Sequence, residues 1–202
     1  VSQDFFVVFL EDGGLLGLRQ HNENYLEPLL FNDYSYIQTL TSMFSRKKKQ
    51  PADRAVACLV IHDKYLVVLT RLCHLKIWDL GSFHLVQEYN LTENFNGTLE
   101  TIEYESNGNY ISTLNDVIVI YLPIGNGVFK FGRLSFTNDG ERKPTFNMFS
   151  SIDANMKKST IWSFVDMKLT DPLELNFTST TFNLIILWKS GSNSKLQILN
   201  IK

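Results

Sequence analysis

The sequence predicts an all-β fold: an incomplete β-propeller of about three and a half WD-like blades, with one inserted amphipathic helix. Three observations lead to this prediction. Short apolar runs of strand length alternate with turn residues along the whole chain. Aromatic residues, which favour strands over helices, make up 13% of the 202 residues. A hairpin-like unit, in which an apolar strand, a polar turn and a short strand follow one another, recurs along the chain.

The hairpin-like unit sets the spacing of the blades. It occurs at Val7–Leu18, Leu66–Asp79, Tyr110–Tyr121 and Leu184–Asn200. If Trp78 and Tyr121 are equivalent, they are 43 residues apart, which suits a WD blade of roughly 40–45 residues. The wider gaps from Leu18 to Trp78 and from Tyr121 to Leu199 then require insertions. A β-sandwich also alternates strands and turns, but it does not explain the repeated unit.

Blades and insertions divide residues 1–202, which we interpret as one partial propeller domain. We expect a partial blade over 1–31, a helical insertion with a basic loop over 33–49, blades over 55–89 and 98–136, a polar insertion over 137–160 and a partial blade over 161–202. The helix is expected at Asp33–Phe44, because Ile37, Leu40 and Phe44 share one face at helical spacing. Gly140–Ser159 is polar and is expected to be irregular.

The two ends of the chain suggest a piece of a larger protein. A strand begins almost at once after Val1, and the chain ends inside another strand, Leu196–Ile201. The end blades of such a piece expose strand edges and an unpaired apolar face. We therefore expect the isolated fragment to be poorly soluble.

The sharpest local motif is the Trp-Asp pair at Trp78 and Asp79, which matches the end of a WD-repeat strand. A well-formed repeat places an acidic residue six positions before the tryptophan and a serine or threonine eight positions before it. Thr70 fills the second slot, but Leu72 occupies the first. We therefore expect the hydrogen-bonded network of a WD blade to be broken here.

The hairpin at Tyr110–Tyr121 carries a drifted form of the same motif. Thr113 and Asn115 occupy the two slots, and Tyr121 takes the place of the tryptophan. Together, the six residues Thr70, Trp78, Asp79, Thr113, Asn115 and Tyr121 form the expected structural blade motif.

Composition argues against several classes of function. The net charge of −2 gives no global field that attracts nucleic acid or an anionic membrane. Cys58 and Cys73 have no zinc-site spacing, and the four histidines form no metal-binding pair. Sequons at Asn90, Asn96 and Asn176 are outweighed by the lack of a visible signal peptide and of a disulfide framework. The sequence predicts an intracellular protein with no cofactor, no metal, no specific nucleic acid and no small-molecule substrate.

The search for catalytic residues yields only acids in turns. Glu11, Asp12 and Asp63 would suit the carboxylates of a propeller hydrolase, but acids are common in turns because they set hairpin geometry. We therefore predict no catalytic residue and no enzyme. A WD-type adaptor that binds a short peptide remains an alternative to a scaffold role, and a propeller hydrolase is a more distant one.

A basic run, Arg46, Lys47, Lys48 and Lys49, follows the predicted helix directly. It could be a nuclear-localisation or phosphate-binding patch, or part of a membrane-sensing helix. We favour a solvated loop after a helix that packs its apolar face on its own domain. The four residues remain candidates for a surface contact.

Longer motifs resemble the amino-terminal propeller of fungal Y-complex nucleoporins of the Nup120/Nup160 type. The matching segments are Phe9–Leu18, Glu27–Asp33, Cys73–Leu80, Ile161–Ser163, Pro172–Asn176, Leu187–Gly191 and Lys195–Asn200. The resemblance covers nearly the whole chain and is weakest over 92–105 and 137–158.

The resemblance implies a propeller followed by a helical solenoid in the intact protein. It implies a structural role in the nuclear pore at the nuclear envelope, supporting mRNA export and protein transport. The implied partners are other Y-complex nucleoporins, bound mostly through the solenoid, with further contacts of propeller loops to neighbouring scaffold or membrane. The family offers no catalytic residue to carry over.

Overall fold

The computed structural model describes residues 5–9, 15–22, 25–31, 53–92, 104, 108–125, 127–136, 144–154, 162–171 and 182–201. All regular structure in these residues is β-strand, arranged as four antiparallel sheets, which confirms the all-β prediction. The expected helix at Asp33–Phe44 and the basic run after it lie outside the described residues. Among the residues described, no helix is long and apolar enough to cross a membrane. The chain folds as two compact units, 1–98 and 99–202.

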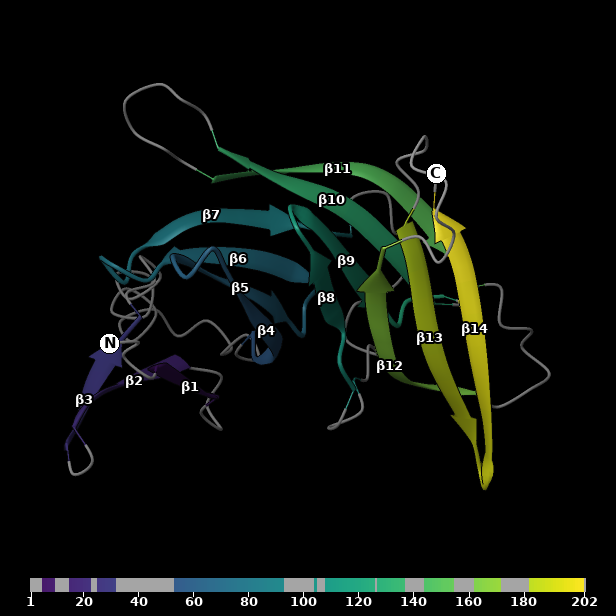
Figure 1. Ribbon diagram of the computed structural model, residues 1–202, viewed down its shortest axis with the longest axis horizontal. Helices are drawn as coiled ribbons and strands as arrows, with labels where there is room; N and C mark the ends of the chain where they lie inside the picture. The colour runs from purple at the N-terminus through teal and green to yellow at the C-terminus, as the bar shows by residue number, and fades with distance from the viewer. Residues whose placement is uncertain are drawn as a thin grey trace, which may run out of the picture. The chain divides into compact units, whose positions relative to one another are not determined.

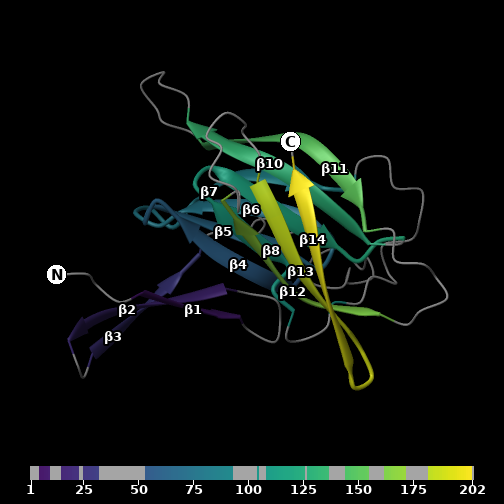
Figure 2. The same ribbon diagram turned by 45° about the vertical axis from the view of Figure 1, so that its right-hand side comes forward.

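The first unit contains two sheets. In the first, β1 (Phe5–Phe9), β2 (Leu15–Asn22) and β3 (Tyr25–Leu30) lie in sequential order, purple in Figure 2. In the second, β4 (Ala55–Ile61), β5 (Tyr65–Thr70), β6 (His74–Asp79) and β7 (Leu85–Asn90) follow one another, blue in Figure 1. This sheet lies in the stretch over which one blade was expected, 55–89, with β7 ending at Asn90.

The core of the first unit forms on the central strand β5, whose six residues are all buried. Leu66 and Val68 pack with Trp78 of β6, and Val7 and Phe31 from the first sheet contact this cluster. Because successive side chains of a strand point to opposite faces, a strand buried throughout needs cover on both faces. The apolar run at 65–69 fits this position, in contrast to the polar alternation of the outer strand β7.

The second unit also contains two sheets. One runs in the order β8 (Ile111–Leu114), β9 (Val117–Leu122), β10 (Val128–Phe136) and β11 (Pro144–Asp153). The other contains β12 (Ser163–Thr170), β13 (Phe182–Ser190) and β14 (Asn193–Ile201), with β14 at an edge (Figure 1). As in β5, all six residues of β9 are buried.

Aromatic side chains join the two sheets of the second unit. The ring of Tyr121 on β9 stacks on Phe164 of β12 at 4.2 Å between centroids and meets Trp188 of β13 edge-on at 5.9 Å. The indole Nε1 of Trp188 donates a hydrogen bond to Gln197 Oε1 at 2.9 Å. Such rings bury large apolar areas, and the indole needs a polar partner when it is buried. The cluster explains why this part of the sequence is rich in aromatic residues.

Two strands were not expected from the sequence. The polar insertion predicted over 137–160 contains β11, which pairs with β10 through Pro144–Asp153 and completes that sheet. The prediction that Gly140–Ser159 is irregular is therefore wrong for this stretch. It failed because β11 exposes much of its length and so lacks an apolar run. β3 was also missed, because it contains Pro28 and proline is rare within strands. β3 is an edge strand, where proline is tolerated.

Among the residues that the structure describes, Trp78 lies on β6, the third strand of its sheet along the chain, and Tyr121 lies on β9, the second described strand of its own. Residues 93–103 and 105–107, ahead of β8, lie outside the described residues. The equivalence of Trp78 and Tyr121 therefore stays a prediction.

Candidate functional site

A polar network lies at the end of the β4–β7 sheet where β5 turns into β6. Asp53, in the connection that leads into β4, accepts a hydrogen bond on Oδ1 from the backbone N–H of Leu72 at 2.9 Å. Its Oδ2 lies 3.2 Å from Nδ1 of His74. Thr70 Oγ1 accepts a hydrogen bond from the His74 backbone N–H at 3.0 Å. The turn that was expected to lack its network is therefore held by an acid from another part of the chain.

The electrostatics of the pair follow from its partial burial. Burial acts to raise the pKa of Asp53, but the nearby His74 side chain, the hydrogen bond from the Leu72 N–H and the nearby Thr70 hydroxyl outweigh it and lower the pKa below its ordinary value. The Asp53 carboxylate, in close contact with Nδ1, raises the pKa of His74, and the charge of Glu88 adds to this effect. Burial and Lys76 oppose it less strongly. The arrangement favours a charged histidine between carboxylates.

The charged groups around His74 come from three segments. Glu88 Oε1 on β7 lies 3.1 Å from His74 Nδ1, and Lys76 Nζ lies 3.8 Å from the same carboxylate oxygen. Asp53 is the more buried of the two acids, with 17% of its side chain exposed against 41% for Glu88. No group of three or more possible metal ligands was found among the residues that the structure describes.

Trp78 and Asp79, the predicted Trp-Asp pair, have separate roles. The Trp78 ring packs edge-on against Phe31 at 6.0 Å between centroids, and its buried Nε1 has no hydrogen-bond partner among the described residues. Asp79 Oδ1 accepts hydrogen bonds from the N–H groups of Gly81 and Ser82 at 2.8 and 2.9 Å. Trp78 is thus part of the core, while Asp79 fixes the turn into β7.

The other three motif residues do not form an equivalent network. Thr113 Oγ1 donates to the carbonyl oxygen of Val117 at 3.0 Å, and Asn115 adopts a left-handed φ of 53° in the same turn. Both residues therefore shape the β8–β9 turn, since asparagine tolerates this conformation. Tyr121 belongs to the aromatic cluster. The structure brings Thr70 together with Asp53 and His74, and sequence reasoning missed the last two.

The remaining candidates give no catalytic arrangement in the described residues. Asp63 is exposed in the β4–β5 turn with a φ of 51°, as expected of a turn acid, and Glu11 and Asp12 lie outside the described residues. Cys73 is buried and Cys58 is half-buried, and burial raises the pKa of the Cys58 thiol. Arg46, Lys47, Lys48 and Lys49 also lie outside the described part of the chain.

Two sheets have an apolar face that is only partly covered. On β13 and β14, Ile185 pairs with Ile198 and Leu187 with Leu196, and we call these four residues the Leu196 face. Leu196 is 61% and Ile198 49% exposed. The opposite face of the same sheet carries Leu184, Ile186 and Trp188 of β13, which are buried. An exposed apolar face of this kind is typical of a surface that another element or a partner covers.

The β1–β3 sheet shows the same asymmetry. Phe6 and Val8 pair with Leu18 and Leu16, and Leu26 shares their side of the sheet; we call these five residues the Phe6 face. Phe6 is 49% and Leu26 48% exposed. The opposite side carries Val7 and Leu15, which pack on the second sheet.

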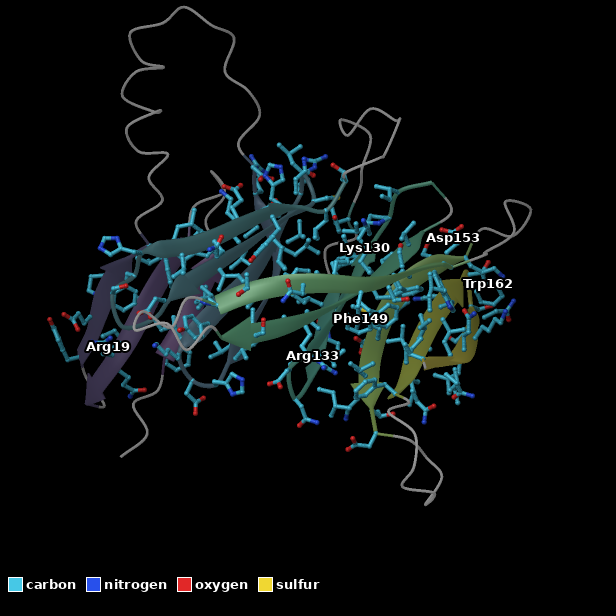
Figure 3. The ribbon with its side chains drawn as sticks, turned by 90° about the horizontal axis from the view of Figure 1, so that it is seen from above. Arg19, Lys130, Arg133, Phe149, Asp153 and Trp162 are labelled. Carbon is cyan, nitrogen blue, oxygen red and sulfur yellow. The ribbon has the colours of Figure 1, made fainter. Side chains whose placement is uncertain are left out.

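A smaller apolar pair lies on the outer strand β11. Met148 and Phe149 are 45% and 50% exposed, at a bulge where two residues of β11 lie opposite the Phe131–Gly132 step of β10. Figure 3 shows Phe149 on β11 with Lys130 and Arg133 nearby on β10.

Comparison with known proteins identifies the fold family. Residues 1–202 match the family described as Nucleoporin Nup120/160, beta-propeller domain. The chain belongs to this family. The members of this family are nucleoporins. Membership of the family confirms the expected localisation at the nuclear pore complex of the nuclear envelope. The β-propeller class and the resemblance noted from the sequence are confirmed as well.

One relative in sequence and one solved structure are similar to this chain. Nucleoporin NUP120 of Saccharomyces cerevisiae is 48% identical over 202 residues, which cover 100% of this chain and 19% of the relative. The chain thus spans about a fifth of that protein. The β-propeller domain of Cps50 (Swd1) from Myceliophteria thermophila superposes with a TM-score of 0.56 at 7% identity, covering 96% of this chain and 55% of that chain. At this identity, the likeness concerns the fold alone.

Proposed function

We propose that the chain is part of the propeller of a structural scaffold nucleoporin in the Y-shaped subcomplex of the nuclear pore, with no catalytic role. The observation that carries the proposal is the 48% identity to a nucleoporin over the full 202 residues of the chain. The β-sheets supply rigid elements, and their loops and exposed side chains are available for contacts. Support of nucleocytoplasmic transport, including mRNA export and protein import, follows from this position.

The proposed partners are other Y-complex nucleoporins. Most of their binding is assigned to a helical solenoid elsewhere in the longer protein, and the propeller adds contacts to neighbouring pore scaffold or membrane through its loops. The basic run at Arg46–Lys49 is a candidate for such a contact. The blade-motif residues Thr70, Trp78, Asp79, Thr113, Asn115 and Tyr121 are proposed to stabilise the domain and not to bind a ligand.

Affinity purification of the tagged full-length protein tests the scaffold role. Mass spectrometry should recover other Y-complex nucleoporins in near-stoichiometric amounts, with an untagged strain as the control. Recovery of none of them would contradict the proposal. Depletion of the protein should also cause polyadenylated RNA to accumulate in the nucleus and slow the import of a reporter; unchanged RNA distribution and import would contradict the transport role.

The absence of a catalytic role has a separate test. Asp63→Asn and Asp12→Asn variants of the full-length protein should support growth at the wild-type rate. A growth defect in a variant that is expressed and assembled normally would favour the hydrolase alternative.

A further inference from the structure

The β5–β6 turn combines the groups of a WD repeat in an unusual order. WD repeats open with a Gly-His pair and close with Trp-Asp, and they place an acid in the turn six residues before the tryptophan. Here that turn position is Leu72, and the acid is Asp53, ahead of the first strand of the sheet. The histidine is His74, directly after the turn. The acid and the histidine have exchanged their places in the chain.

The contacts of Asp53 make up for the missing turn acid. Its Oδ1 binds the backbone N–H of Leu72, the same residue that occupies the acid slot. The two chain segments are also joined next to this contact, since the Arg71 N–H donates to the Arg54 carbonyl oxygen at 2.7 Å. A charged acceptor on a partly buried N–H is a strong form of hydrogen bond. Asp53 therefore holds the connection into β4 against the β5–β6 turn.

We propose that Asp53 and His74 form an exchanged acid–histidine pair that does the work of the WD-repeat network in the β4–β7 sheet. The pair fixes the position at which the chain enters β4. Thr70 connects the pair to β5 through its bond to the His74 N–H. Trp78 is left out of the pair and contributes by packing.

The proposal can be tested by local hydrogen exchange in the full-length protein. Asp53→Ala should lower the protection of amides in peptides covering 65–80 by about tenfold or more, because it removes the bond to Leu72 and leaves His74 without its buried acid. Asp53→Asn, a milder change that keeps an acceptor, should give a smaller loss. Peptides covering 182–201, from the other compact unit, report whether each variant is still folded.

The decisive arm exchanges the two residues. It is done with Glu88→Gln in every variant, because an aspartate at position 74 would otherwise meet Glu88. Asp53→His and His74→Asp should each lower protection about tenfold, since each leaves two like groups facing one another. The combined exchange should recover most of that loss. Glu88→Gln alone should change protection by less than about threefold, as its carboxylate is the more exposed one.

Two results would overturn the proposal. One is unchanged protection of the 65–80 peptides in Asp53→Ala. The other is a combined exchange in which the fold-loss of protection equals the product of the fold-losses in the two single variants.

Discussion

At the scale of single residues, the polar network depends on a partner that is remote in the sequence. Leu72 and Asp53 are 19 positions apart, and only the pairing of β4 with β5 brings them together. The sequence showed that Thr70 occupies the serine or threonine position of the WD repeat. It also showed that Leu72 occupies the position where an acidic residue is expected. It could not show that the acid arrives from the preceding connection. The available signals, an acid just before an apolar strand and a histidine just after a turn, are common in β proteins.

The Asp53–His74 pair makes stability depend on pH in a defined window. His74 has a raised pKa, so its contribution is complete below the ordinary value of 6.5 and is lost as pH rises through the folded-state pKa. Asp53 has a lowered pKa, so its contribution is complete above the ordinary value of 3.8 and is lost as pH falls through its folded-state pKa. Both contributions are present between these two values. Lys76 and Glu88 are the other charged groups that act on His74.

Exchange of the imidazole C2 hydrogen, followed by mass spectrometry of the full-length protein across pH, measures the His74 midpoint directly. We expect a midpoint above that of the denatured protein, and a downward shift in Asp53→Asn because the partner charge is removed. The denatured sample of each variant is the reference. A His74 midpoint equal to or below the denatured value would contradict this assignment.

At the scale of strands, patterns of burial decide what the sequence can reveal. β5 and β9 were predicted because they are buried throughout and read as apolar runs. β11 was read as an insertion because only its first residues are buried, while Met148 and Phe149 face solvent. The spacing of apolar residues and the strand propensity of each residue report only on the local sequence. The pairing of β11 with β10 depends on another strand, so it does not show in the sequence of β11 itself.

Two phenylalanines on β11 test whether this strand is integral to its sheet. Phe146 is 6% exposed and its ring covers Gly132 of β10, whereas Phe149 is 50% exposed. Phe146→Ala should therefore destabilise the sheet by about 3–5 kcal/mol, and Phe149→Ala by less than about 1 kcal/mol. The difference can be measured by pulsed hydrogen exchange of β10–β11 peptides of the full-length protein across a urea series.

The matched pair keeps residue type and strand constant, so burial is the variable that differs. Equal midpoints for the two variants would mean that β11 does not hold the sheet together.

At the scale of the whole molecule, the Phe6 face and the Leu196 face leave apolar side chains of two sheets exposed in the part of the chain that the structure describes. β5 and β9 are covered on both sides, but β13 alternates between buried and partly exposed residues. The chain spans 19% of its yeast relative, so a longer protein has ample material for further sheets. Burial of about 100 Å² of apolar surface contributes roughly 2.5 kcal/mol, so leaving such faces in water is costly. We infer that further sheets of the longer protein cover them.

The isolated chain of 202 residues should therefore self-associate, and the Leu196 face offers a way to show why. Leu196→Lys with Ile198→Lys should raise the soluble, monomeric fraction of the isolated chain in sedimentation, because the changes place charges on an exposed apolar face. The control is Met148→Lys with Phe149→Lys, which removes similarly exposed apolar groups outside both faces and should help less. In the full-length protein the two double variants should have the opposite effects. The Leu196 and Ile198 changes should lower the yield of folded protein, since a neighbouring sheet then buries these side chains. The control changes at Met148 and Phe149 should leave the yield unchanged. A wild-type fragment that is soluble, monomeric and cooperatively unfolding would show that these faces need no neighbour.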